Sequence, residues 1–460
     1  MKLSHSPASV TARFDDTHLI GYAGLVPAMR LAEAAGLYQL AKDLVHVPGD
    51  KGANPDLKIA SLLAGMAAGA DCIDEMDLIR HGGMDKLFTN WRAPSTLGSF
   101  LRSFSFGHAR QVEALATGLL HGLDRCSALF GPNGAAGPVM VDIDDTLIEV
   151  FSPSKQGAAI GYTKVRGLDL LLATASTRQA PPVVIGSRLR KGSAHSARGA
   201  TKLVEDALGV IDRSTLAGRQ VWLRADSGFY NHQITSAIMK RDGWFSLTIR
   251  TDPLIRKAIA AIPDDAWTAI RYPEAIFDDQ LDAWISDAEV AETLFTAFKS
   301  KGAPVTARLV VRRIPEAQPQ PDQQGLFQVW RYYGFITNVP IDEYDTVTID
   351  QAHRQHAVIE QVNAALKQAA LAHLPCAKFA ANMVWATCAI MTHNLLRALA
   401  SITGDPQITK ATPTGIQRTL IQVPARIATS GRRTIMHLPH NWTWATSWLA
   451  AFTTSARAPA

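Results

Sequence analysis

The sequence predicts an α/β protein in which a mixed sheet is interrupted by an inserted β subdomain, preceded by a helical region and followed by helical segments. Two observations carry this prediction. From residue 138 onward, short runs rich in Val, Ile and Leu alternate with helical patterns, which is typical of a sheet with helical crossovers. Before that point apolar residues recur at helical spacing, and the Gly/Pro-rich stretch "LFGPNGAAGP" (129–138) separates the two regions.

Residues 1–130 are expected to form the helical N-terminal region. "GLVPAMRLAEAAGLYQLAKDLV" and "LKIASLLAGMAAGA" carry apolar side chains at helical spacing. "APSTLGSFLRSF" begins a further helix, with Ser95 or Thr96 as its N-cap. A chain of 460 residues is too long for one compact core, so several domains are expected.

Residues 138–251 form the first part of the predicted sheet domain. In chain order we expect three strands, a helix, a strand, a helix and a strand, at 139–151, 168–176, 181–190, 197–211, 220–226, 231–242 and 244–250. The first three strands can pair as an antiparallel meander, whereas the later ones need helical crossovers. This order of elements is the one expected of an RNase H-like domain.

Residues 252–348 interrupt this scheme. "VTARLVVRRI" and "FQVWRYYGFITN" alternate as half-exposed strands do, and "PEAQPQPDQQG" (315–325) between them is a predicted loop. We therefore expect an inserted, largely β subdomain. Helix resumes near residue 350, so residues 349–400 are expected to complete the sheet domain, and residues 401–460 form a basic C-terminal segment.

Acidic residues lie within one of the predicted strands and at the end of another. In "VMVDIDDTLIEVF" (139–151), Asp142 and Asp144 point to one face of the strand and Asp145 to the other, because side chains alternate. Asp226 ends a strand in "LRADSGFYN". Strand ends in open α/β sheets are the usual place for ligand chemistry.

A further acidic residue lies in "HRQHAVIEQVNAALKQ" (353–368). Spacings of 3, 4, 3 and 4 residues put five polar side chains on one helix face: His353, His356, Glu360, Asn363 and Lys367. The polar face of an ordinary surface helix gives the same pattern. A zinc site made by His353, His356 and Glu360 is a weaker alternative, because the histidines are not spaced as in H-E-x-x-H.

The distribution of charge favours a polyanionic partner. The net charge is only +5, yet no acidic residue follows Asp405, and "SRLRKGSAHSARGATK" (187–202) is basic without an acid. Neutralising phosphates is the main non-specific source of nucleic-acid affinity, although a solvated surface also explains a single basic run. The basic candidates for phosphate contacts near the aspartates in sequence are Lys164, Arg166, Arg188, Arg190, Lys191 and Arg198.

Several other classes of protein are disfavoured. No stretch reaches 18 uncharged apolar residues, and "MKLSHSPASV" has no apolar signal region, so we expect a cytoplasmic protein without a membrane span. The four cysteines show no C-x-x-C pair, which favours reduced core cysteines over structural zinc.

Three tryptophans, Trp442, Trp444 and Trp448, can stack on an extruded base, but tryptophans with this spacing more often belong to a core.

Two classes of enzyme open an active site with a strand of this kind. In haloacid-dehalogenase phosphatases the first Asp, here Asp142, is the nucleophile and the second, Asp144, the acid/base, but that match covers only residues 139–147. A second resemblance runs through nearly the whole chain. Seven blocks are similar, in order and spacing, to bacterial insertion-sequence DDE transposases of the group numbered thirteen-eighty: "MAAGADCIDEMDLIRHGG", "APSTLGSFLRSF", "VDIDDTLIEVF", "QGAAIGYTKVRGLDLLLA", "SRLRKGSAHSARGA", "LRADSGFY" and "HRQHAVIEQVNAALK".

The resemblance implies a catalytic and metal-binding triad of Asp144, Asp226 and Glu360, holding two Mg²⁺ (or Mn²⁺) ions. Such ions prefer carboxylate oxygen and suit phosphodiester displacement. The implied function is to cut DNA at the ends of the element and to join the freed 3′-hydroxyls to target DNA. The implied partners are terminal inverted repeats, target DNA and a second copy of the chain, in the bacterial nucleoid, with the helical N-terminal region binding DNA and dimerising.

The wider class has a Tyr, Arg, Glu, Lys pattern on the helix that carries the catalytic Glu. Glu360 and Lys367 match it, whereas His353 and His356 stand at the Tyr and Arg positions. His356 and Lys367 therefore join the candidates for DNA contact, with Asp142 and His353 as supporting residues. A catalytically inactive DNA-binding derivative of a transposase is a third hypothesis.

Overall fold

The computed structural model describes residues 9–132, 134–161, 163–270, 277–278, 283–284, 288–302, 304–315 and 330–457. It divides into two compact units, Met1–Ser127 with Ala380–Ala460, and Ala128–Phe379. Most of the predicted loop 315–325 lies outside the described residues. Within the described part of the chain, no helix is both long and apolar enough to cross a membrane.

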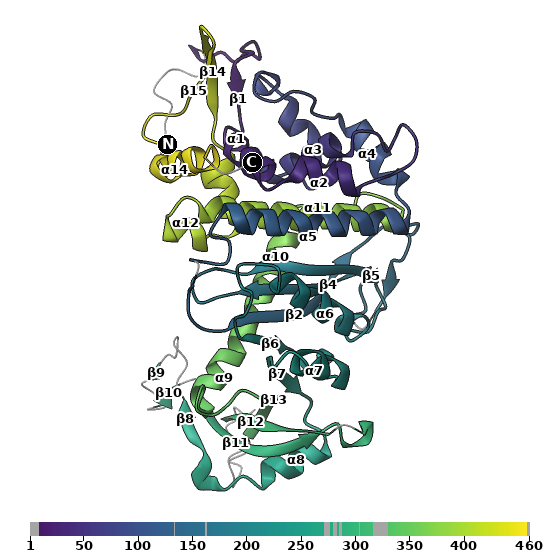
Figure 1. The fold of residues 1–460 in the computed structure, drawn as a ribbon, viewed down its shortest axis with the longest axis vertical. Helices are drawn as coiled ribbons and strands as arrows, with labels where there is room; N and C mark the ends of the chain where they lie inside the picture. Colours follow the sequence, from purple (N-terminus) through teal and green to yellow (C-terminus); the bar gives the residue numbers. More distant parts are fainter. Residues whose placement is uncertain are drawn as a thin grey trace. The chain divides into compact units, whose positions relative to one another are not determined.

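The second unit is built on a mixed sheet (Figure 1). Its first strands pair antiparallel, β2 with β4 and β4 with β5, whereas β2, β6 and β7 are parallel neighbours. Helical crossovers connect the parallel strands, as the sequence predicts. The bounds are β2 (Val139–Glu149), β3 (Ala159–Ile160), β4 (Arg166–Ser176), β5 (Val183–Lys191), α6 (Ala200–Ile211), β6 (Val221–Ala225), η4 (Ser227–Phe229), α7 (His232–Met239) and β7 (Trp244–Ile249). The RNase H-like α/β architecture is therefore confirmed.

The strands of the insertion continue this same sheet. β13 pairs antiparallel with β7, and the strand order β3-β4-β2-β6-β7-β13-β12-β11-β8 runs through the core and the insertion without a break. The insertion thus covers the edge that β7 would otherwise expose. Its elements are α8 (Pro253–Ala260), η5 (Asp264–Ala266), β8 (Thr268–Ile270), β9 (Phe277–Asp278), β10 (Ala283–Trp284), β11 (Ala288–Ala297), η6 (Lys299–Lys301), β12 (Val305–Pro315) and β13 (Trp330–Thr337).

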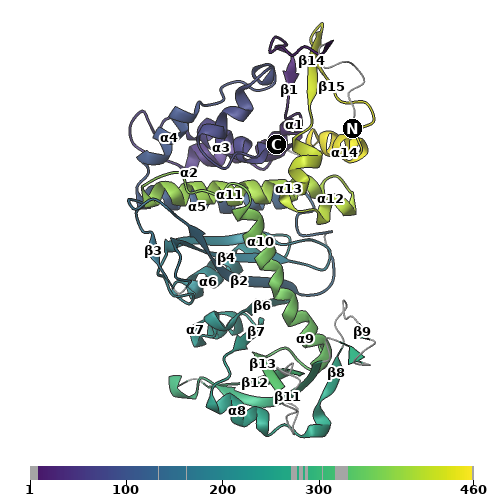
Figure 2. The same ribbon diagram turned by 180° about the vertical axis from the view of Figure 1, so that it is seen from behind.

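The helix predicted over 353–368 is split in two. α9 (Thr346–Arg354) and α10 (Val358–Lys367) are separated by the 3₁₀ turn η7 (Gln355–Ala357). At this turn the side chain of His356 donates from Nδ1 to the carbonyl of His353 at 2.9 Å. Figure 2 shows α9 and α10 running one after the other along the sheet, and α10 packs against β2.

The first unit combines the two ends of the chain around a buried helix. Every residue of α11 (Phe379–Ser401) from Ala380 to Ala400 is buried, as expected of a helix that is apolar all round. Its N-terminal elements are β1 (Leu19–Ile20), α1 (Leu25–Ala34), α2 (Leu37–Leu44), α3 (Pro55–Ala68), η2 (Asp74–Arg80), η3 (Met84–Lys86), α4 (Pro94–Ser103) and α5 (Phe106–Cys126). Its C-terminal elements are α12 (Pro406–Lys410), α13 (Pro413–Ile416), η8 (Gln417–Ile421), β14 (Ala425–Ser430), β15 (Arg433–His437) and α14 (Ala445–Ser455).

Two details of this unit differ from the sequence-based expectation. The cap of α4 is Ala93 rather than Ser95 or Thr96, because Pro94 takes the first helical position, where its missing N–H costs nothing. The segment from residue 380 onward groups with the N-terminal helices instead of completing the sheet domain.

Backbone contacts hold the two ends together. Ala23 donates from its amide to the carbonyl of Val423 at 2.9 Å, and β1 pairs antiparallel with β14. Of the three tryptophans considered for base stacking, Trp448 belongs to the core, 2 % exposed, with its indole N–H on the carbonyl of Leu420 at 3.0 Å. Trp442 and Trp444 are half-buried and form an edge-to-face pair.

Replacing Gly24 by Ala is expected to destabilise the first unit by about 1–3 kcal/mol, because a Cβ there would lie 1.7 Å from the carbonyl oxygen of Leu420. Urea denaturation measures the loss. Gly21→Ala is the matched control, since a Cβ at that position meets nothing within 4 Å. Equal stability of the two variants would contradict the close approach of α1 to η8.

Candidate active site

Asp144 of β2 is held by two hydrogen bonds. Its Oδ1 accepts from the amide of Asp145 at 2.8 Å, and its Oδ2 accepts from Nδ2 of Asn363 at 2.8 Å. Asn363 belongs to α10, one turn after Glu360, so the two residues share a helix face. The hydrogen bond therefore turns the face that carries Glu360 toward Asp144.

Asp226 stands beside Asp144 on the neighbouring strand. Ile143 is in register with Ala225 in the parallel pair β2–β6, so the next residues of the two strands are Asp144 and Asp226. Asp226 follows the last residue of β6, and its Oδ1 accepts from the amide of Gly228 at 2.8 Å. Asp144, Asp226 and Glu360 thus come from β2, the end of β6 and α10.

The pKa values of these carboxyls show that the charges interact. The pKa of Asp144 is raised to about 7, chiefly by burial and also by the charges of Asp145, Asp226 and Glu360, against the hydrogen bond from the Asp145 amide. Although the residue Asp226 is largely exposed, loss of solvent around its carboxylate and the charge of Asp145 raise its pKa. Such a cluster of acids is stable in the charged form only when a cation is present.

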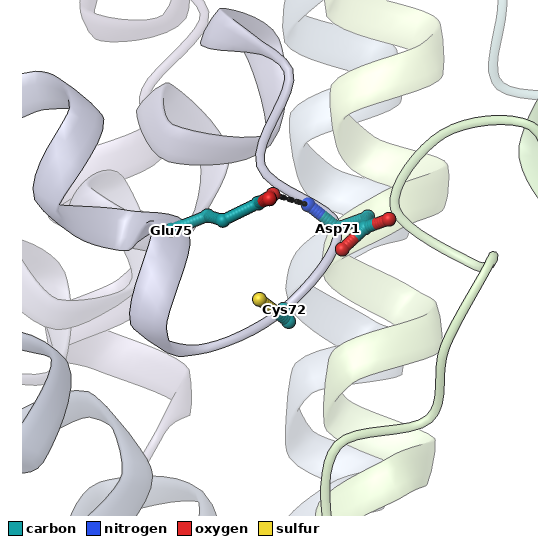
Figure 3. Close-up of side chains that lie close together, drawn as sticks. All are labelled: Asp71, Cys72 and Glu75. Carbon is teal, nitrogen blue, oxygen red and sulfur yellow. Dashed lines mark hydrogen bonds between the residues drawn. The ribbon is translucent and has the colours of Figure 1, made fainter.

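The carboxylate oxygens of Asp144, Asp226 and Glu360 are spaced more widely than the ligand atoms of a closed metal site. In the described ranges, a single group of three ligand-type side chains has all its donor atoms within 4.8 Å of one another, and it is Asp71, Cys72 and Glu75 of the first unit (Figure 3). There Glu75 accepts from the amide of Asp71, and burial raises the pKa of the Cys72 thiol, which favours the protonated form. Glu75 is the exposed member of this group.

Asp142 is fully buried in an ion pair. Its two oxygens accept from Nε and Nη2 of Arg224 at 2.7 and 2.8 Å, and Arg224 also donates to the carbonyl of Ala352 at 2.6 Å. The exposed fraction of Asp142 is 0 %. A nucleophile must reach its substrate, so this geometry removes the phosphatase interpretation, in which Asp142 attacks phosphorus.

His353 is a core residue. Its Nδ1 and Nε2 lie 2.9 and 3.0 Å from the hydroxyls of Ser246 and Thr248, and its ring stacks on Phe335 at 4.0 Å. Burial lowers its pKa well below the usual value, so the imidazole is neutral. With both ring nitrogens engaged, His353 has no nitrogen free for zinc.

His356 lies next to the carboxylates. Its Nδ1 must donate to the carbonyl of His353, because a carbonyl oxygen only accepts. Burial raises the pKa of Asp142 and of Asp226, and the nearby His356 side chain acts in the opposite direction. The side chain is half-buried.

Arg190 is the centre of a second buried network. It donates to Asp145 at 2.7 Å, to Asp169 at 2.6 Å, and to the backbone carbonyls of His195, Ser196 and Arg198 at 3.3, 2.9 and 2.7 Å. Ser196 donates its hydroxyl to Asp145 as well, at 3.2 Å. Arg190 thus fixes Asp145 and the backbone of the basic stretch instead of facing solvent.

The other basic candidates divide by their partners. Arg166 donates to the carbonyls of Val150, Ser152 and Pro153, and Arg188 forms an ion pair with Asp206. Four candidates are exposed: Lys164, Lys191, Arg198 and Lys367. These four residues are therefore the candidates whose positive charge faces solvent.

Sequence reasoning missed Arg224, Asp145, Asp169 and Asn363 as parts of the site. Arg224 sits at an inward position of an apolar strand, "VWLRA", where an arginine needs a buried acid as partner. Asp169 in "LDLLLATAS" gives the same signal for Arg190. Asn363 carried no signal beyond its place on the polar helix face.

The family model described as transposase DDE domain group 1 matches residues 4–459. The comparison with curated proteins found no match to this chain.

Asp144→Asn is expected to raise the melting temperature of the metal-free protein more at pH 8 than at pH 5. A folded-state pKa near 7, above the value of 3.8 in the unfolded chain, gives stability below pH 4 that is lost as the pH rises through 7. The variant has no carboxyl group at this position, so its stability does not fall in this way as the pH rises. Thermal denaturation in EDTA at both pH values measures it, and an equal difference at both would contradict the clustered acids.

Proposed function

Because this chain belongs to the DDE transposases, we propose that it cuts phosphodiester bonds at the ends of an insertion sequence and joins the freed 3′-hydroxyls to target DNA. What supports this proposal is the proximity of Asp144, Asp226 and Glu360, carried by two adjacent parallel strands and one helix, so that the other two charges act on the carboxyl of Asp144. These are the three positions at which the family resemblance expects the catalytic acids.

The residues present suit divalent metal ions, which this family typically uses. The donors are carboxylate oxygens, the ligands that Mg²⁺ and Mn²⁺ prefer. Burial is the main cause of the raised pKa of Asp144, and the neighbouring acids add to it a repulsion that a cation would offset. Asp144, Asp226 and Glu360 would hold two such ions. When bound, the ions supply activation of the attacking oxygen and stabilisation of the leaving one.

The chain's own residues supply position. The Asp145 amide and Asn363 fix the carboxylate of Asp144, and the turn after β6 fixes Asp226 through Gly228. Arg190 holds the backbone of residues 195–198, so that the exposed Arg198 stands on an ordered loop. Ordered basic side chains next to the acids would bind the phosphates on either side of the scissile bond.

The second surface for DNA is the β14–β15 hairpin of the first unit. Arg426, Arg432 and Arg433 are exposed on it, and only Arg426 has a described acidic partner, Asp16 at 3.2 Å. We propose that this hairpin and four exposed residues of the second unit, Lys164, Lys191, Arg198 and Lys367, bind the backbone of the element ends. Two copies of the chain would act together, since an element has two ends to cut.

Glu360→Gln is expected to abolish cleavage of a terminal-repeat duplex in Mg²⁺ while leaving its DNA affinity within a few-fold, because the change removes a metal ligand and not a phosphate contact. Gel assays of cleavage and of binding in EDTA measure the two effects. Glu149→Gln, at the exposed end of β2, is the matched control and should cut normally. Normal nicking by Glu360→Gln would remove this residue from the site.

The double variant Arg432→Ala/Arg433→Ala is expected to lower DNA affinity and to flatten its salt dependence. Each phosphate contact contributes about 0.9 to the slope of log K against log salt, so losing two contacts lowers the slope by about 1.8. Arg256→Ala/Lys257→Ala, two exposed cations of α8, is the control with equal change of charge. A slope unchanged by the hairpin variant would count against this surface.

A further inference from the structure

Asn363 joins the helix that carries Glu360 to the strand that carries Asp144. Its Nδ2 donates to Oδ2 of Asp144 at 2.8 Å, and this is the one side-chain hydrogen bond on that carboxylate among the described residues. The second bond comes from the backbone amide of Asp145 and is independent of side-chain identity. Asn363 is thus the residue through which the side chain of Asp144 can be oriented by α10.

The other half of this amide is unpaired. Oδ1 of Asn363 is buried and has no hydrogen-bond partner in the described part of the chain, and the exposed fraction of the residue is only 5 %. The amide cannot turn over to relieve this, because an ionised carboxylate accepts and the NH₂ group must face it. A buried acceptor without a donor is unfavourable, so the position calls for a partner that the protein itself does not provide.

The surroundings limit what that partner is. Asn363 contacts Asp144, whose neighbours Asp145, Asp226 and Glu360 are all acids, so an anion or an apolar group is excluded by charge or by polarity. A divalent cation with its water shell fits, since it neutralises the acids and its waters donate hydrogen bonds to oxygen. Groups that hold a metal ligand in this way often matter nearly as much as the ligand itself.

We propose that Asn363 is a positioning residue of the metal site: it aligns Asp144 through Nδ2 and receives a hydrogen bond from the cation's water shell at Oδ1. The inference rests on the proposed function, because it concerns the same metal site. Asn363 touches neither DNA nor the scissile phosphate. Its role is to set how tightly the acids hold the ion.

The test measures Mn²⁺ binding to the full-length chain without DNA, by electron paramagnetic resonance of the free ion. Asn363→Leu keeps the volume of the side chain and removes both polar atoms. We expect its Mn²⁺ affinity to fall about 10- to 100-fold. Its melting temperature in EDTA should equal or exceed that of the wild type, because the unpaired buried oxygen is gone. A merely structural role would lower stability together with affinity.

Gln361→Ala is the matched control, an exposed amide on the same helix, and should bind Mn²⁺ as the wild type does. Asn363→Ser is measured alongside, so that the inference can still be tested if the leucine variant does not fold. Wild-type affinity in a folded Asn363 variant would overturn the inference and leave the transposase proposal intact. Absence of Mn²⁺ binding by the wild type would overturn both the metal site and the inference.

Discussion

The ion pair between Asp142 and Arg224 is the interaction on which the site depends. Both side chains are buried, at 0 % and 2 % exposed, and the arginine bonds the end of α9 through the carbonyl of Ala352. One pair therefore ties β2, β6 and α9 together, two residues before Asp144 in β2 and two residues before Asp226 at the end of β6. Removing one partner of such a pair typically costs about 3–5 kcal/mol, because the other charge is left buried and alone.

On the opposite face of β2, Arg190 forms the corresponding buried ion pairs. Asp142 pairs with Arg224, which also bonds α9, and Asp144 bonds Asn363 of α10. Asp145 instead bonds Arg190, which also bonds Asp169. The three aspartates of one strand thus have three different environments, and alternation along the strand assigns them. The basic stretch 187–202 is accordingly not one surface, since Arg190 belongs to the interior and Lys191 and Arg198 to the outside.

Much of the fold follows from the sequence, because strands rich in Val, Ile and Leu and the Gly/Pro linker have local causes. The order of the core strands along the chain and the position of Asp226 at a strand end could therefore be predicted. What the sequence could not supply depends on contacts distant in the chain. The pairing of Asp142 with Arg224 needs the register of β2 and β6. The pairing of β13 with β7, by which the inserted β subdomain continues the sheet, likewise depends on residues far apart in the chain. The turn at residues 355–357 lies inside an unbroken helical pattern and has no sequence signal.

The division of the first unit between the two ends of the chain has a consequence for how the protein is made. Residues 1–127 leave the ribosome first, but α11, which fills their core, begins only at Phe379. At ordinary rates of synthesis the wait is on the order of tens of seconds. During that time the apolar faces of the early helices lack their partner and are exposed to chaperones and proteases. A truncated messenger RNA that ends before the codons of α11 would then yield a sheet domain with an incomplete helical unit. We expect the cell to degrade this fragment, so that it does not compete with the full-length protein for DNA.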